Sequence, residues 1–549
     1  MAIVRNATPF LIVLLAGAVF AAPASKKFIL CGWELQKATP AQILANADKL
    51  AATSFDGLGV YVRSTNSAGQ VYDVREIMHQ MWPVDAFDEH LPALCAFSRT
   101  DHLRESFLIS FRSPWQRIAW TNEADWRSIS TNMSVLARLA CRAGIRGLII
   151  DHEDYGNQRQ FLACKGDPAY GVLKDLARQR GREVFGSVFR EYPEVRLLFY
   201  WLLTANRDYF EGNDPRAVAE SRKDLWPSFV DGILDVMPET ARLIDGDEHS
   251  YWSDYRTRDF HVSAAWQRML APKLLSPENR AKHALLVQVS FGQYLDMYAN
   301  PKGSYWYFDP VDGSRAEHFR RNLKDATQLA DEYLWFWGEH HPTVKWESMP
   351  LNKRIDGKDQ TWDECVPGFL SAMAGVRDAD GGLRRRKAEL EAKGALVDSN
   401  PNAACVGAGH DLPMPYQMWR NKNERDSAFG RDDQVGDGDR SSVVMRGSKS
   451  GTLSAVFSSM VAGRSYYVSC RGKGSRPIGL IKWKKGGVWT QSEITLDFGS
   501  AGADGWQTTE TYLTVPSGVD EMCVILYSIP PRTEKDAVWF DNLHVYRLF

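Results

Sequence analysis

Ile145-Arg146-Gly147-Leu148-Ile149-Ile150-Asp151-His152-Glu153-Asp154-Tyr155-Gly156 contains an apolar run of strand length that stops at two carboxylates, Asp151 and Glu153. Strand side chains alternate between two faces, so these carboxylates point the same way. A parallel strand buried on both faces is apolar throughout, and its polar residues gather at the C-terminal end, where ligands bind. We therefore predict a buried parallel strand that ends at a reactive site.

Length and composition narrow the class of protein. A chain of 549 residues is too long for one ordinary core, so two or three domains are expected. A formal net charge of -2 shows no basic surplus, which argues against nucleic acid as a partner. The 19 Trp and 20 Tyr favour flat amphipathic ligands such as sugars.

Residues 1–22 have the pattern of an export signal. Arg5 gives a basic start, Phe10 to Phe20 form a short apolar core, and small residues follow, which predicts cleavage near Ala21 to Ala24. An uncut membrane anchor is the alternative, but it needs a longer apolar span. No later segment approaches a membrane span. We expect a secreted, periplasmic or cell-surface protein.

Strand-like and helix-like segments alternate over residues 27–350. A helix at Pro40–Ala52, for example, has Thr39 as its N-cap and proline at its first position. The predicted strands are Phe28–Trp33, Gly57–Val62, Ser106–Phe111, Gly147–Asp151, Arg196–Trp201, Arg242–Asp245, Leu285–Val289 and Leu334–Trp337. This alternation predicts an α/β domain folded as a (β/α)8 TIM-type barrel. The rival open sheet lacks a glycine-rich turn after its first strand.

In such a barrel, residues at the C-terminal strand ends converge on one mouth. Acids and aromatics occupy several of these ends. The candidate substrate-binding residues are Trp33, Glu34, Tyr155, Trp201, Glu248, Trp252, Gln288, Trp335 and Trp337.

Glycoside hydrolysis needs two carboxyl groups, one as proton donor and one ionised, with aromatic platforms for the sugar rings. A negative Asp151 beside Glu153 disfavours a second charge, so we assign Glu153 as the acid. Asp151, Asp245 and Glu339 remain alternatives for the second catalytic carboxylate. The structural alternative for the first pair is an N-capping aspartate followed by a surface glutamate.

No metal or cofactor is predicted. The eight cysteines contain no CxxC pair, and His152, His249, His340 and His341 do not form an HxH or HExxH pattern. Hydrogen-bonded histidines at a polar mouth are the expected alternative.

The chain changes character after the barrel. A helical extension and linker are expected over residues 351–399, including the charged amphipathic segment Trp362–Lys393. Residues 400–549 show short alternating segments separated by turns, which predicts an all-β sandwich. Its candidate glycan-binding residues are Trp419, Trp483, Trp489 and Trp506, with core packing as the alternative for each.

Two resemblances follow from these motifs. Gly147–Glu153 resembles the fourth-strand motif of chitinase-type glycoside hydrolases, with Asp151 and Glu153 on its last two acidic positions and Ile149 where the family has an aspartate. Trp337 is similar to that family's tryptophan at the floor of the sugar site. The C-terminal part resembles jelly-roll carbohydrate-binding modules attached to cellulases and xylanases, in the order of the segments Ser442–Met445, Gly463–Ser469, Thr514–Pro516 and Val538–Leu543. These resemblances imply a catalytic barrel followed by a glycan-binding jelly roll.

The expectation is a secreted glycoside hydrolase acting on a polysaccharide or glycoprotein glycan. Two alternatives remain open. One is a non-catalytic glycan-binding or adhesion protein with a degenerate barrel, which Ile149 would allow. The other is a metal-dependent hydrolase on the same barrel.

Overall fold

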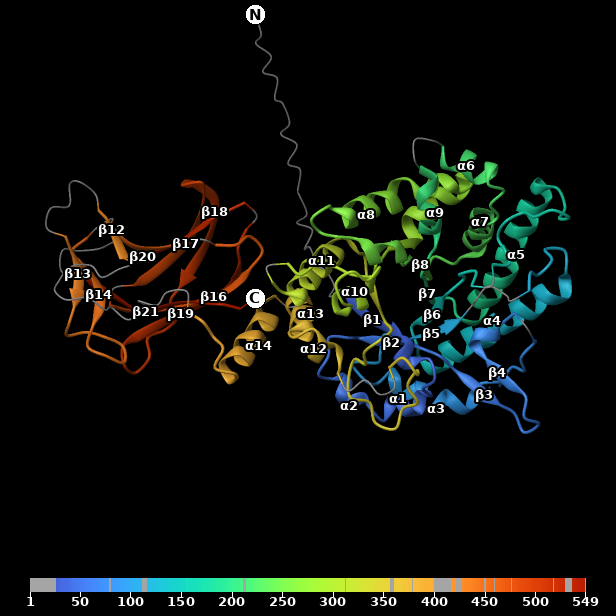
Figure 1. Cartoon of the computed structure of the whole chain (residues 1–549), viewed down its shortest axis with the longest axis horizontal. Coiled ribbons are helices and arrows are strands. Elements are labelled where there is room, and N and C mark those ends of the chain that lie inside the picture. Colours follow the sequence, from blue (N-terminus) through green and yellow to red (C-terminus); the bar gives the residue numbers. More distant parts are fainter. Residues whose placement is uncertain are drawn as a thin grey trace, which may run out of the picture.

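The computed structural model describes residues 26–548, apart from 79, 111–115, 156, 211–213, 312, 356–359, 378, 399–415, 421–426, 449–450, 459, 475, 517 and 529–535. The predicted export signal lies outside these residues. Figure 1 shows a mixed α/β part built around a parallel sheet and a second part made of antiparallel sheets, with helix α14 between them.

The α/β part contains a nine-stranded parallel sheet in the order β10-β11-β1-β2-β5-β6-β7-β8-β9. The strands are β1 (Lys27–Gly32), β2 (Gly57–Val60), β5 (Phe107–Ser110), β6 (Gly147–Ile150), β7 (Arg196–Phe199), β8 (Arg242–Asp245), β9 (Val287–Val289), β10 (Gly292–Tyr294) and β11 (Tyr333–Gly338). Only Ser290 and Phe291 separate the two edge strands along the chain, so the sheet curls until its edges meet. This curled sheet is consistent with the predicted barrel.

Helices follow most strands and cover the outside of the sheet. They are α1 (Pro40–Leu44), α2 (Ala47–Leu50), α3 (Leu91–Phe97), α4 (Glu123–Ala143), α5 (Tyr170–Glu191), α6 (Pro215–Ser221), α7 (Trp226–Val236), α8 (Asp259–Met269), α9 (Pro277–Leu286), α10 (Asp296–Ala299) and α11 (Arg315–Leu329). Local sequence sets their ends. Asn122 Oδ1 accepts the Ala124 amide 3.1 Å away at the start of α4, and Gly144 ends that helix in the left-handed region at φ 70°. Thr39 caps α1 as predicted, and it also forms a capping box with Gln42.

The seventh predicted strand, Leu285–Val289, differs from the structure. Helix α9 continues to Leu286, and the strand consists of two short pieces, β9 and β10. Gln288 lies on the earlier piece, where it pairs with Ile244 of β8.

The antiparallel part consists of two five-stranded sheets, ordered β12-β15-β20-β17-β18 and β13-β14-β21-β16-β19. Their strands are β12 (Tyr416–Trp419), β13 (Ala428–Asp432), β14 (Ser442–Arg446), β15 (Thr452–Ser458), β16 (Ser465–Gly474), β17 (Pro477–Lys485), β18 (Val488–Asp497), β19 (Trp506–Thr514), β20 (Glu521–Ser528) and β21 (Ala537–Arg547). A hydrophobic core that includes Leu453, Val468 and Ile481 draws on both sheets. The two antiparallel sheets agree with the predicted all-β class, and the jelly-roll connectivity stays a prediction.

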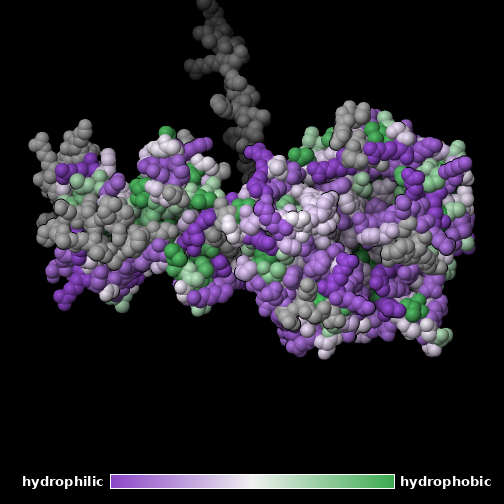
Figure 2. Space-filling view, in the orientation of Figure 1, coloured by the Kyte–Doolittle hydropathy of each residue, from purple (hydrophilic) through white to green (hydrophobic). Residues whose placement is uncertain are grey.

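Three helices, α12 (Trp362–Cys365), α13 (Phe369–Arg377) and α14 (Ala379–Ala392), occupy the predicted extension. Leu383 of α14 packs in a small cluster with Tyr467 and Leu548 of the antiparallel part. Arg320 of α11 donates a hydrogen bond of 2.5 Å to the Gly463 carbonyl. Figure 2 shows mainly hydrophilic residues over the α/β part in this view, with hydrophobic residues in scattered patches.

A small residue at Gly147 is required where β6 begins. A Cβ built there would lie 1.8 Å from the Arg196 carbonyl oxygen of β7, whereas one at Gly171 on α5 meets nothing within 4 Å. We expect Gly147→Ala to lower the free energy of unfolding by roughly 3 kcal/mol or more, because the backbone of β7 cannot move freely. The matched change Gly171→Ala should cost nothing or stabilise by up to about 1 kcal/mol. Urea denaturation followed by circular dichroism measures both, and equal stabilities would contradict this packing.

Candidate active site

A cavity of about 700 Å³ opens at the C-terminal edge of the parallel sheet. It is lined by eight aromatic residues, namely Trp33, Tyr61, Tyr155, Tyr200, Tyr251, Tyr294, Trp306 and Trp337. Four carboxyl groups join them: Asp151, Glu153, Glu248 and Glu339. The other lining residues are Gln36, Arg75, Ile109, Ser110, Asn300, His340 and Arg354. The lining residues follow eight different strands of the curled sheet, as the sequence predicts for a mouth at the strand ends.

Asp151 and Glu153 lie together at the end of β6. The Glu153 amide donates to Asp151 Oδ1 at 3.1 Å, and the Tyr155 hydroxyl donates both to Asp151 Oδ2 at 3.3 Å and to Glu153 Oε2. Trp201 Nε1 donates to Glu153 Oε1 at 3.2 Å. Burial and the charges of both carboxylates raise the pKa of Tyr155, so its hydroxyl remains a donor. The two oxygens of Glu153 therefore both face donors.

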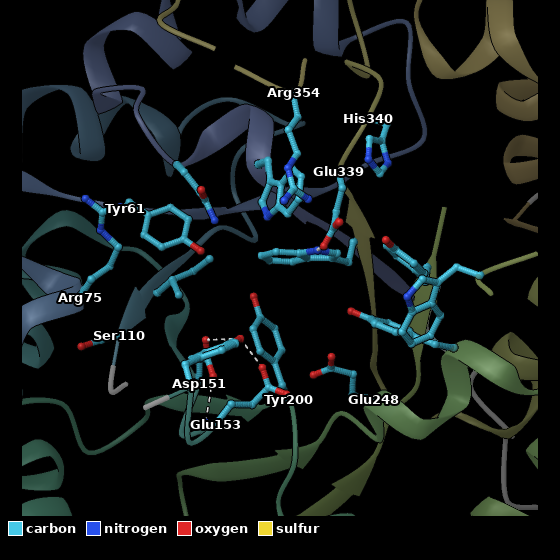
Figure 3. A pocket seen from close by; sticks show the side chains of 18 of the residues that line it. Tyr61, Arg75, Ser110, Asp151, Glu153, Tyr200, Glu248, Glu339, His340 and Arg354 are labelled. Atoms are coloured by element: carbon cyan, nitrogen blue, oxygen red, sulfur yellow. Dashed lines mark hydrogen bonds between the residues drawn. The ribbon is translucent and has the colours of Figure 1, made fainter. Parts of the chain in front are cut away.

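Glu248 lies in the same cavity, near the start of the 3-10 helix that follows β8 (Glu248–Trp252). Burial raises its pKa well above the usual value, and the charges of Glu153, Asp151 and Glu339 raise it further. Figure 3 shows Glu248 beside Glu153 and Asp151, with Glu339 across the cavity. Burial and the charges of three neighbouring carboxylates thus favour the protonated form of Glu248.

Glu339 follows β11 on the other side of the cavity. Its Oε1 accepts from Trp337 Nε1 at 3.0 Å, and its amide donates to Asp296 Oδ2 at 2.9 Å. Burial raises the pKa of Glu339 as well. His340 bonds to Asp296 through Nδ1 at 2.5 Å, and Asp296 raises its pKa. Trp337 of β11 and Glu339, which directly follows the strand, line the same cavity.

Asp245 is buried and lies outside the cavity lining. Its Oδ1 accepts the Leu202 amide, and its Oδ2 accepts the Leu203 and Thr204 amides, all at 3.0 Å. The Thr204 hydroxyl adds a bond of 2.5 Å to Oδ1. With both oxygens engaged in the turn after β7, Asp245 has a positioning role in this structure.

Three predicted substrate-binding residues are also placed elsewhere. Glu34 is buried and accepts hydrogen bonds from the Thr343 amide and hydroxyl at 2.8 and 2.7 Å. Trp335 is fully buried beneath Tyr200, with ring centroids 4.2 Å apart. Gln288 donates to Glu332 at 3.2 Å, beside the start of β11, and is not among the residues that line the cavity. The interrupted seventh strand accounts for this placement, because Tyr294 of the second piece, β10, lines the cavity instead.

The remaining predicted aromatic residues lie in or beside the cavity. Trp33 lines it and carries the Arg354 guanidinium 4.3 Å above its ring. Trp252 stacks on the lining residue Trp306 at 4.6 Å. Trp201 lines a second cavity next to Glu153.

Sequence reasoning misses Tyr61, Tyr294 and Arg354. Tyr61 directly follows β2, so an inspection of every strand end would find it. Tyr294 belongs to β10, which the sequence pattern does not reveal as a strand. Arg354 comes from a segment after β11 whose sequence gives no signal for a position in the cavity.

The predicted glycan-binding tryptophans of the antiparallel part divide into two pairs. Trp483 and Trp506 are 1% and 3% exposed, so they pack inside and cannot present a ring to a glycan. Trp419 and Trp489 are 58% and 50% exposed and lie on the two edge strands of one sheet, β12 and β18. Burial thus corrects two of the four assignments.

Over the part of the chain that the structure describes, no group of three His, Cys, Asp or Glu residues is arranged to hold a metal ion. Within the same residues, no helix is both long and apolar enough to cross a membrane.

No protein-family description and no curated protein matches this sequence. Solved structures give short matches. The enzymatically active domain of bacteriophage CBA120 tailspike protein 4 matches at 10% identity over 26% of this chain and 21% of its own, with a TM-score of 0.22. The C-terminal family 22 carbohydrate-binding module of Clostridium thermocellum Xyn10B matches at 15% identity over 27% of this chain and 98% of its own, with a TM-score of 0.21. The linked CBM22-1 and GH10 modules of a xylanase from that organism match at 12% identity over 24% of this chain and 26% of theirs, with a TM-score of 0.18. Matches this short do not define the activity of the chain.

Asp247, next to Glu248, gives a pH dependence of stability. It is fully buried and burial raises its pKa to about 7, so the folded protein retains a proton that the unfolded chain loses near pH 4. The free energy of unfolding should fall as pH rises from about 4 through 7, by roughly 2–3 kcal/mol between pH 5 and 8. Asp247→Asn should reduce the measured difference by about this amount, because asparagine carries no charge to bury. Thermal unfolding of both proteins at the two pH values measures it, and an unchanged slope in the variant would contradict the assignment.

Proposed function

We propose that the protein is a glycoside hydrolase that acts on a polysaccharide or a glycoprotein glycan. The single observation that carries this proposal is the cavity in which Glu248, whose pKa is raised by burial and by neighbouring carboxylates, lies beside Asp151 and Glu153. Glycoside hydrolysis needs this combination of a protonated and an ionised carboxyl group. The aromatic lining adds flat surfaces on which sugar rings stack.

Glu248 is the proton donor in this proposal. It gives its proton to the leaving glycosidic oxygen as the bond from that oxygen to the anomeric carbon breaks. Glu153 is the ionised partner, which either attacks the anomeric carbon or takes a proton from the water that does. Water supplies the hydroxyl of the new reducing end, and the remaining proton restores Glu248. Trp201 and Tyr155 hold the Glu153 carboxylate through hydrogen bonds.

This assignment exchanges the roles that the sequence indicates, where Glu153 is the acid. The burial of Glu248 and the three carboxylates around it support the exchange. We also propose that this activity acts outside the cytoplasm, and the predicted export signal supports that proposal.

Glutamine variants test the roles. Glu248→Gln should lower turnover of natural glycans by about two to four decades, because it cannot donate a proton. Its turnover of dinitrophenyl glycosides should fall far less, since their leaving group needs no proton. Glu153→Gln should abolish turnover of both substrate types. Glu278→Gln, with 60% of its side chain exposed on α9, is the matched control. Release of reducing sugar from a glycan panel and release of dinitrophenol are the measurements.

The opposite pattern between the two variants would return the acid role to Glu153. Full activity in both would contradict hydrolysis at this site. The pH profile gives an independent check: kcat should fall as pH rises through the raised pKa of Glu248, because the deprotonated group has no proton to give. In Glu248→Gln that fall should be absent.

The antiparallel part is proposed to hold the polymer through its exposed tryptophans. We expect Trp419→Ala and Trp489→Ala each to reduce retention several-fold on an insoluble polymer of the kind that the protein hydrolyses. Each exposed ring offers a stacking surface for sugars. Turnover of soluble oligosaccharides should stay the same. Val488→Ala changes a 70% exposed apolar neighbour of Trp489 and serves as control. Pull-down on insoluble polymer measures retention, and equal retention by all four proteins would contradict the binding role.

A further inference from the structure

A second cavity of about 640 Å³ adjoins the first between the segments that follow β6 and β7. Its lining includes Asn157, Phe161, Trp201, Ala205, Asn206 and His249. Glu153 lines both cavities, and Trp201 Nε1 donates to it from the side of the second cavity. The Glu153 carboxylate therefore lies at the boundary between the two cavities.

Asn206 is the most informative residue of the second cavity. Its side chain is only 2% exposed, and its Nδ2 donates to Asp224 Oδ2 at 2.7 Å. No described residue donates a hydrogen bond to its Oδ1. A buried acceptor without a donor costs about 1–3 kcal/mol, so the wall of the second cavity carries an unsatisfied polar group at Asn206.

Charge and aromatic content define the ligand further. Glu153, Asp154 and Asp224 face a single arginine, Arg159, which disfavours an anionic ligand. His152 adds no positive charge, since burial lowers its pKa to about 3. Its ring stacks on Trp226 with centroids 3.8 Å apart, and Trp201 stands edge-on to His249 at 4.4 Å. A neutral, hydroxyl-rich molecule with flat apolar faces fits these walls, and a sugar has that chemistry.

We propose that the second cavity is a saccharide subsite, so that the protein binds a glycan chain on both sides of Glu153 and cleaves within the chain. The inference rests on the proposed glycosidase function and adds the substrate class to it. The substrate is an internal bond of an oligosaccharide or polysaccharide. A terminal sugar alone would leave the second cavity unused.

Filling the cavity tests the subsite without removing any hydrogen bond. Ala205 is partly buried in the lining, and Ala205→Trp would occupy the space. Full-length protein is assayed on cello-, xylo- and chito-oligosaccharides of two to six sugar units. In the oligosaccharide series that the unsubstituted protein hydrolyses, kcat/KM should rise with chain length, because binding energy at a remote subsite accelerates the reaction. The ratio of kcat/KM between the longest and shortest substrates should fall about tenfold in Ala205→Trp.

Two further variants complete the experiment. Val262→Trp, at a 56% exposed position on α8, should keep the unsubstituted ratio. Ala205→Leu should lower the ratio less than tryptophan does, and it keeps the test valid if Ala205→Trp does not fold. An unchanged ratio in a folded, active Ala205 variant would overturn the subsite and leave the glycosidase proposal intact. Absence of hydrolysis of any glycan by the unsubstituted protein would overturn both.

Discussion

The buried carboxylate of Asp245 fixes the end of β8 to the turn that follows β7. A buried carboxylate is costly unless it is fully hydrogen-bonded, and Asp245 meets this condition with three backbone amides at 3.0 Å. Trp201 directly precedes those amides, and Glu248 follows Asp245 by three residues. One carboxylate thus sets the relative position of the indole that bonds Glu153 and the carboxyl group of Glu248.

The curled parallel sheet brings acids from separate parts of the chain into one cavity. Parallel strands place all their C-terminal ends at the same edge, so β6, β8 and β11 deliver Glu153, Glu248 and Glu339 to the same space. Like charges this close cannot all ionise without a large cost. This repulsion raises the pKa of Glu248, whose burial already favours its neutral form. Carboxyl groups held this close together would destabilise an ordinary core, whereas in this cavity they favour a protonated group that can donate its proton.

Sequence periodicity predicts the frame well because its signal is local. Continuous apolar runs identify β6 and the other main strands, and alternation correctly places Asp151 and Glu153 in one cavity. It fails where tertiary contacts decide. Glu34 follows β1 and looks like a mouth residue, yet the loop after β11 covers it and supplies its donors.

The interrupted seventh strand shows a second limit. An apolar run ending in Val289 does not reveal that the chain regains the sheet three residues later as β10, so Gln288 is selected and Tyr294 is missed. The tryptophans of the β-sandwich show the same limit of sequence-based prediction, because a tryptophan ring can either pack in the core or lie on the surface. Trp483 and Trp489 are six residues apart, and only burial separates them.

The sequence Asp-Gly-Asp-Glu after β8 concentrates features that stability alone would not favour. Asp247 is buried with a pKa near 7, and its backbone lies in the left-handed region at φ 41° without being glycine. Strain and burial of this kind persist where the surrounding structure holds them in place, and they gather at functional sites. Here the surroundings are the Ser263 hydroxyl, which donates to Asp247, and the hydrogen bonds of Asp245, two residues earlier in the chain. Asp247 immediately precedes Glu248. The stability that the strain and burial of Asp247 cost is therefore tied to the position of the carboxyl group whose pKa the cavity raises.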